Sequence, residues 1–158
     1  MVLREGQVMK KHILIVVALG IILLVYGCSR FHISSKEAQD IVKRDFSEHS
    51  EDFKIIADLL LAYTDRDISI SDNKYDTSTD MTINNDIYQM EAGKNLSELG
   101  YDLITKPLEG GVYFYRFRQP FLGRGLMYYP NGFCPEYNQL VIEYIPLTAD
   151  GWYYFVEE

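Results

Sequence analysis

Apolar residues recur at spacings of three and four between residues 38 and 63, which places their side chains on one face of a helix. Ser34 and Glu37 have the spacing of a capping box, which satisfies free backbone N–H groups where a helix begins. The polar stretch 47–52 interrupts the pattern, and Ser50 can cap a second helix there. The pattern therefore predicts one or two amphipathic helices with this apolar face: Ala38, Val42, Phe46, His49, Phe53, Ile56, Leu60 and Tyr63.

The segment between these helices and residue 101 predicts shorter elements. Residues 68–71 alternate between apolar and polar and indicate a short strand. The aspartates of 72–80 lack the glycine and the terminal glutamate of a calcium-binding loop, so we interpret this stretch as a solvated turn. Residues 83–92 fit a strand and a helix equally well, and 94–99 indicate a helical turn that ends at Gly100.

From residue 101 onward the apolar pattern has a period of two, which is typical of strands. Short connections between successive strands, including the hairpin signal Asp150-Gly151, predict an antiparallel sheet. The helices must cover one face of this sheet, because each element has to bury its apolar side. We therefore expect a single α+β domain at 36–158, with one or two amphipathic helices on a mainly antiparallel sheet of four to five strands. These strands are expected at 101–105, 112–119, 125–129, 140–146 and 152–157.

Period-two alternation assigns the side chains of these strands to two faces. The simplest assignment buries one set beneath the helices: Tyr113, Tyr115, Phe117, Leu140, Ile142, Tyr144, Trp152 and Tyr154. The other face then mixes aromatic rings with charges, including Glu143 and Glu157. Aromatic rings beside arginines can stack on a sugar or hold a peptide, although an ordinary sheet face with amphipathic tyrosines has the same composition. The candidate binding residues are Phe114, Arg116, Arg118, Tyr153 and Phe155.

The N-terminal segment predicts a membrane tether. Residues 13–25 form an uncharged apolar run, which is short for a membrane span but suits a secretory signal, and Lys10 and Lys11 precede it. The residues Val25-Tyr26-Gly27-Cys28 resemble a bacterial lipobox, and this resemblance implies lipid attachment at Cys28. We expect 1–28 to be a signal peptide with a lipobox-like end, or alternatively a retained membrane helix, and 29–35 to be a short tether. Both alternatives place the domain outside the cytoplasm, on the cell membrane.

Charge narrows the range of partners. After residue 27 the chain carries 12 basic and 22 acidic residues, a formal charge of −10. Such a domain repels nucleic-acid phosphates and favours a cationic partner, although acidic surfaces also serve solubility. Cys134 is the one cysteine besides Cys28, so the domain is not a disulfide scaffold, and a buried thiol is the simplest interpretation of Cys134.

Sequence motifs for catalysis are missing. The three histidines are isolated, and no catalytic triad, metal-ligand cluster or phosphate-binding loop can be assembled at credible spacings. The glycine-rich stretch 121–125 opens no predicted helix, so we interpret it as a flexible hairpin loop. We therefore expect no metal, no cofactor and no enzymatic activity.

The tail at 146–155, together with the signal that ends at Cys28, resembles small uncharacterised lipoproteins predicted in Gram-positive bacteria. That group has no assigned activity to carry over. We expect a membrane-tethered extracytoplasmic binding or accessory module with a protein or glycan partner. One alternative is a surface-anchored inhibitor or immunity protein against a secreted toxin or hydrolase, and another is an envelope-modifying enzyme.

Overall fold

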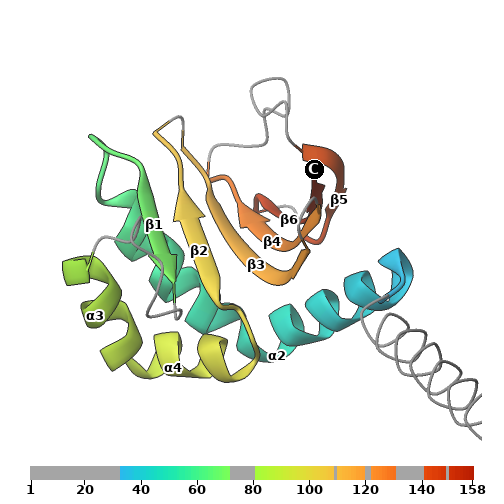
Figure 1. Ribbon diagram of the computed structural model, residues 1–158, viewed down its shortest axis with the longest axis horizontal. Helices are drawn as coiled ribbons and strands as arrows, with labels where there is room; N and C mark the ends of the chain where they lie inside the picture. Colours follow the sequence, from blue (N-terminus) through green and yellow to red (C-terminus); the bar gives the residue numbers. More distant parts are fainter. Residues whose placement is uncertain (1–32, 72–80, 109, 120–121, 131–140, 149) are drawn as a thin grey trace, which may run out of the picture. The chain divides into compact units, whose positions relative to one another are not determined.

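The computed structural model describes residues 33–71, 81–108, 110–119, 122–130, 141–148 and 150–158. Lys36–Glu158 forms one compact unit, an α+β domain in which three helices pack on a six-stranded antiparallel sheet (Figure 1). The predicted class is confirmed, but one further helix and one further strand are present. The predicted signal or anchor segment 1–28 lies outside the described residues.

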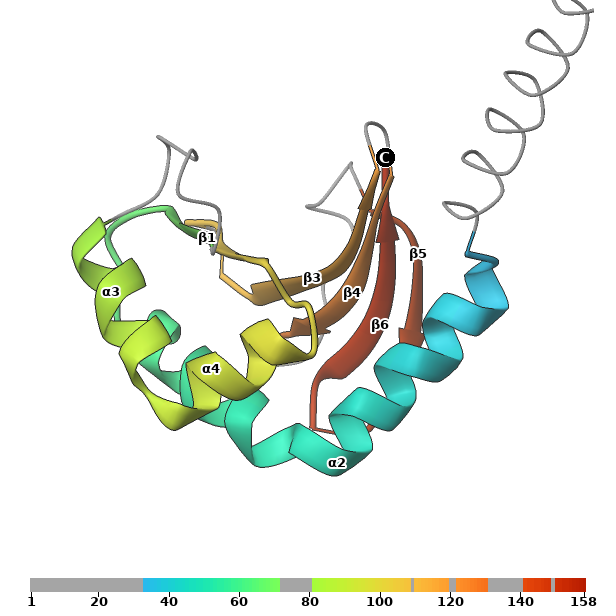
Figure 2. The same ribbon diagram turned by 60° about the horizontal axis from the view of Figure 1, so that its bottom comes forward.

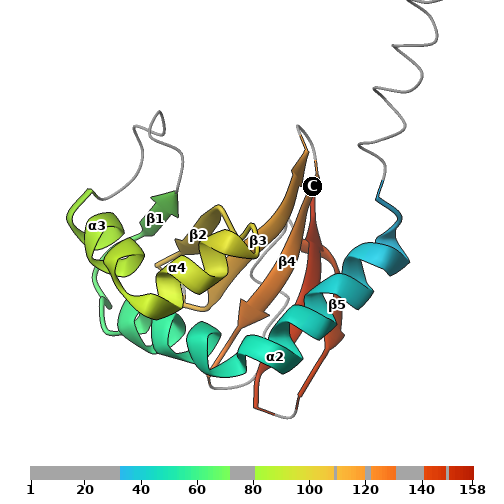
Figure 3. The same cartoon turned by 90° about the horizontal axis from the view of Figure 1, so that it is seen from below.

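The first described helix, α2 (Ser35–Leu61), follows the predicted apolar stripe. Ala38, Val42, Phe53, Ile56 and Leu60 of this stripe are buried. His49 has non-helical backbone angles, φ −128° and ψ 24°, so the helix kinks inside the polar stretch where a break was expected. The kink lets the two halves of α2 lie against different parts of the sheet (Figures 2 and 3).

Two short helices, α3 (Met81–Gln89) and α4 (Glu91–Glu98), follow strand β1 (Ile68–Ser71). The ambiguous stretch 83–92 is thus helical. Helix α4 ends as predicted, because Gly100 adopts a φ of +89° and Tyr101 N–H returns to the Leu96 carbonyl at 2.9 Å. Only glycine adopts such a positive φ without steric cost.

Five further strands follow, which are β2 (Leu103–Lys106), β3 (Val112–Gln119), β4 (Leu122–Tyr128), β5 (Val141–Pro146) and β6 (Trp152–Glu157). Together with β1 they form the sheet in the order β1-β2-β3-β4-β6-β5, with every neighbouring pair antiparallel. The predicted hairpin between the last two strands is confirmed, since β5 pairs with β6 and Leu147 N–H donates to the Trp152 carbonyl at 2.8 Å.

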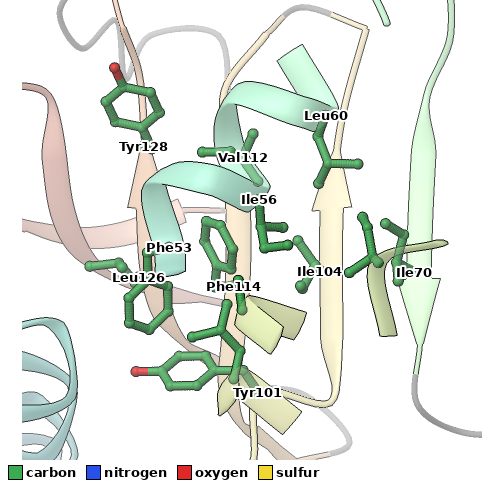
Figure 4. Packing of buried hydrophobic residues seen from close by; sticks show 14 of the residues in the cluster. Phe53, Ile56, Leu60, Ile70, Tyr101, Ile104, Val112, Phe114, Leu126 and Tyr128 are labelled. Carbon is green, nitrogen blue, oxygen red and sulfur yellow. The ribbon is translucent and has the colours of Figure 1, made fainter. Parts of the chain in front are cut away.

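All three helices cover the same face of the sheet, and the main core lies between the two layers (Figures 2 and 3). Phe53 of α2 is at its centre, with its ring edge-on to the rings of Tyr101 and Phe114 at centroid distances of 4.9 and 5.2 Å (Figure 4). Trp152 of β6 stacks on Tyr128 of β4 at 4.4 Å. Aromatic packing therefore joins the longest helix to the central strands.

The face predicted for β3 is wrong in its first half. Phe114 is fully buried in the main core, while Tyr113 belongs to a second cluster with Met127 and Phe155. Phe114 pairs across the sheet with Leu126, which pairs in turn with Tyr154 on the helix-covered face. The alternation alone could not decide this, because both faces of β3 are aromatic. A β-bulge between Tyr115 and Phe117 then shifts the alternation of side chains between the two faces by one residue. Phe117 therefore packs against the main core, as expected.

Strand β5 also departs from expectation. Ile142 and Tyr144 were predicted to be buried, but their side chains are 55% and 41% exposed. Strand β5 is an edge strand with a register shift between Val141 and Glu143, and it lies beyond the centre of the helical layer. By contrast Trp152 and Tyr154 of β6 are buried beneath the helices, as predicted, whereas Leu140 lies outside the described residues.

Candidate functional site

The outer face of the sheet points away from the three helices, and rows of residues cross it over β3, β4, β6 and β5. Residues paired across antiparallel strands share a face. The strand register gives three such rows, which are Arg118, Gly123, Glu157 and Val141; Tyr115, Gly125, Phe155 and Tyr144; and Tyr113, Met127, Tyr153 and Pro146.

The middle of the outer face is a small second core, not an open binding surface. Tyr113, Met127 and Phe155 are buried there. The Phe155 ring is edge-on to Tyr113 and to Tyr115, with centroids 5.3 and 5.2 Å apart. The hydroxyls of Tyr113 and Tyr129 lie 2.7 Å apart, within hydrogen-bond distance. These tyrosines therefore pack against one another in the middle of this face.

The five candidate binding residues do not share one face, which corrects the expected surface. Phe114 is part of the main core, and the Arg116 side chain turns to the helices. Phe155 and the half-buried Tyr153 are on the outer face, but Phe155 is inaccessible. Of the five, only Arg118 is both exposed and placed at a pocket.

Arg116 instead forms an ion pair that links β3 to helix α2. Its Nε lies 3.2 Å from Asp45 Oδ2 on α2, and the Asp45 side chain is only 1% exposed. Gly100 leaves space for the guanidinium, because a Cβ there would be 2.4 Å from Arg116 Nη1. This pair joins the helical layer to β3, and a nearby contact joins α2 to α4, where Asn95 Nδ2 donates to Asp52 at 3.0 Å.

A pocket of about 470 Å³ opens at the margin of the outer face, where β3 ends, β4 begins and β6 ends. Gly123 is part of its lining, and a Cβ at this position would stand 2.9 Å from the Tyr115 ring and 3.8 Å from Glu157 Cβ. Glycine therefore lets the Tyr115 ring lie over this position, beside Glu157. The lining residues are Tyr115, Arg118, Gln119, Leu122, Gly123, Glu157 and Glu158, of which Leu122 also packs against the main core.

Hydrogen bonding fixes the orientation of one pocket carboxylate. The Tyr115 hydroxyl donates to Glu157 Oε2 at 2.5 Å. Burial, followed by this hydrogen bond to Glu157, raises the pKa of Tyr115 well above its usual range, so the phenol stays a proton donor. Arg118 Nε lies 3.7 Å from Asp102 Oδ1, at the side of the pocket. The pocket thus presents the fixed carboxylate of Glu157 beside the Tyr115 ring.

The Tyr115 phenol keeps its proton at neutral pH. A phenol with a raised pKa is a poor base and a poor nucleophile at neutral pH. Among the described residues, no group of three or more histidine, cysteine, aspartate or glutamate side chains could hold a metal ion.

Comparisons with protein-family models, with curated proteins and with solved structures found no match for this chain.

Most of the pocket was not predicted. The stretch at 121–125 was interpreted as a hairpin loop, whereas Leu122, Gly123 and Gly125 belong to β4. Glycine inside a strand marks a close approach of another backbone or ring, and this signal was present in the sequence. A Cβ at Gly125 would be 1.8 Å from the Phe114 carbonyl oxygen.

Proposed function

We propose that the protein is a membrane-tethered, extracytoplasmic, non-catalytic module that binds a protein partner through the pocket at the margin of its outer face. The observation that carries the proposal is the pocket itself, which combines an oriented carboxylate and other charged side chains with the Tyr115 ring on a face that no described helix covers. Mixed lining of this kind is typical of specific binding sites.

The tether rests on the sequence. The basic flank at Lys10 and Lys11, the apolar run 13–25 and the lipobox-like end at Cys28 support export followed by lipid attachment. In the part of the chain that the structure describes, no helix has the length and apolarity to cross a membrane. A tether at Cys28 would leave the compact unit accessible to partners outside the cytoplasm.

The edge strand beside the pocket supports a protein partner over a glycan. Val141 shares a cross-strand row with Glu157 of the pocket, and the exposed Ile142 and Tyr144 follow on β5. Exposed aliphatic and aromatic side chains next to a polar pocket are typical of protein interfaces. The exposed Ile142 and Tyr144 would also suit a surface-anchored inhibitor of a secreted toxin or hydrolase, which is one specific form of the proposed module. A toxin or secretion gene adjacent to the gene for this protein would favour that form.

Co-purification from membranes with two matched variants tests the proposal. Glu158→Arg reverses a charge in the pocket lining, whereas Glu48→Arg makes the same change at an exposed site on α2, away from it. We expect a protein that enriches with the tagged full chain to be retained by Glu48→Arg and lost with Glu158→Arg. Equal thermal unfolding of both variants serves as the folding control. A partner retained equally by both variants, or no enrichment over membranes without the chain, would refute the proposal.

A further inference from the structure

We infer that the pocket accepts an arginine or lysine side chain of the partner; this inference rests on the proposed function and names the group that the pocket binds. The guanidinium or ammonium would lie against Glu157 and Glu158, and its methylene chain against the Tyr115 ring. Three features of the described residues carry this assignment, namely the charge balance of the pocket, its hydrogen-bond acceptors and its size and lining.

The charge balance of the pocket is negative. Two carboxylates, Glu157 and Glu158, line it together with one guanidinium, that of Arg118. The Arg118 charge is opposed by Asp102, whose carboxylate lies 3.7 Å away outside the lining. The excess of negative charge therefore belongs to the two glutamates, and the charge of −10 after residue 27 adds long-range attraction for a basic partner.

The acceptors of Glu157 are oriented toward such a ligand. Because Tyr115 donates to Oε2, the carboxylate is held in place, and Oε1 is left to accept a bond from a ligand. A carboxylate has about four lone-pair sites and can accept from a donor group with several N–H bonds. Tyr115 retains its proton because its pKa is raised, so it keeps this carboxylate in position at neutral pH.

The size and lining of the pocket fit a long side chain with a charged end. Its volume is about 470 Å³, and the Tyr115 ring lies over Gly123 beside Glu157. The ring offers apolar surface to methylene groups, which lysine and arginine bury while their charged ends bind elsewhere. An anionic ligand would meet the two glutamates. A sugar would need a flat exposed ring, whereas the Tyr115 ring already packs at 90° to Phe155.

Titration of the full chain in neutral detergent micelles with one pair of peptides tests the inference. The probe is the blocked pentapeptide Gly-Leu-Arg-Leu-Gly, and its control replaces arginine with citrulline, which has nearly the same shape but no charge. Binding is followed by the NMR shifts of the Leu122 and Gly123 amides. Glu157→Gln removes the pocket carboxylate, and Glu48→Gln makes the same charge change on the exposed surface of α2.

We expect the arginine peptide to shift the Leu122 and Gly123 amides, and the citrulline peptide to leave them unchanged. Glu157→Gln should weaken binding by about fivefold or more, as for loss of a partly exposed ion pair, whereas Glu48→Gln should leave it within about twofold. Equal weakening by both variants would show non-specific attraction to an acidic surface and would overturn the inference. So would equal binding of the two peptides, or no shift at either amide.

This result is separable from the test of the proposed function. If the co-purified partner depends on the pocket but the arginine peptide does not bind there, the module remains and the assigned ligand group is wrong. If no partner depends on Glu158, the proposed function itself fails, whatever the peptide does.

Discussion

Asp45 carries its charge in the interior of the domain, where two arginines approach it. Arg116 Nε lies 3.2 Å from it and Arg44 Nη2 lies 3.3 Å away, but the side chains are 24% and 60% exposed, respectively. Removing the inner partner of a buried charge costs far more than removing an exposed one. We expect Arg116→Met to lower the free energy of unfolding by about 3 kcal/mol, and Arg44→Met by less than about 1 kcal/mol, in urea titrations. Equal losses would show that the buried ion pair is not the main link between α2 and β3.

Tyr101 predicts how stability depends on pH. Burial, followed by the negative charge of Asp45, raises the pKa of Tyr101 well above its usual range. In the unfolded chain the phenol ionises near pH 10, so above about pH 10 the unfolded state binds fewer protons than the folded state. The Tyr101 contribution is therefore fully present below that pH and is lost as the pH rises further. We expect the Tyr101 contribution to the free energy of unfolding to fall by about 1.4 kcal/mol for each pH unit above about pH 10.

Urea midpoints of the wild type and of Tyr101→Phe, measured between pH 8 and pH 11, separate this contribution from those of other tyrosines. The variant should show a shallower decline above pH 10, because its residue 101 has no proton to lose. Parallel curves for the two proteins would mean that Tyr101 ionises in the folded state as easily as in the unfolded one.

At the scale of single residues, the sequence predicted which side chains are apolar but not always which way they point. The first half of β3 has aromatic residues on both faces, so only its pairing with Leu126 and Ile104 decides that Phe114 is covered by the helices. Arg118 and Glu157 were both noticed in the sequence. Their approach to Tyr115 required the bulge at 115–117, which no local pattern indicates.

The β5–β6 hairpin depends on the glycine that the sequence identified. Gly151 has a φ of +89°, and a Cβ there would stand 2.0 Å from the Tyr129 carbonyl oxygen. Gly110 has a φ of +99° but has no atom within 4 Å of such a Cβ. We expect Gly110→Ala to cost about 1 to 2 kcal/mol of unfolding free energy, from backbone strain alone, and Gly151→Ala about 3 kcal/mol or more. Thermal or urea unfolding of the pair measures the difference. An equal cost would contradict close packing of β6 on the end of β4.

At the scale of elements, the kink of α2, the end of α4 and the last hairpin were predictable because their signals are local, whereas α3 was not, since residues 83–89 fit a strand equally well. The kink of α2 at His49, the end of α4 at Gly100 and the Asp150-Gly151 hairpin all lie where the pattern placed them. The sheet edges were not predictable, because they depend on tertiary contacts. Asn84 of α3 accepts a hydrogen bond at 3.0 Å from the Ser71 N–H of edge strand β1, whereas the other edge strand, β5, exposes Ile142 and Tyr144.

For the whole molecule, the tether makes a prediction about the intact protein. If Cys28 is lipidated, the mature chain should begin at Cys28, carry the mass of a diacylglyceryl group and partition into detergent. Cys28→Ala should abolish that modification and release the cleaved form or leave an unprocessed precursor. Intact mass spectrometry of membrane and soluble fractions reads out both forms. A full-length, unmodified chain that stays in the membrane in both proteins would establish the alternative, a retained transmembrane helix.

The central claim is that a tethered domain contacts a protein partner through one pocket. Site-specific photo-crosslinking in intact cells tests it most directly, with a benzophenone side chain at Arg118 in the pocket or at the exposed Leu108 as the matched control. The account predicts a discrete crosslinked product from position 118 that is absent from position 108, and that an additional Glu157→Gln substitution weakens. No product from position 118, or the same product from both positions, would contradict the account.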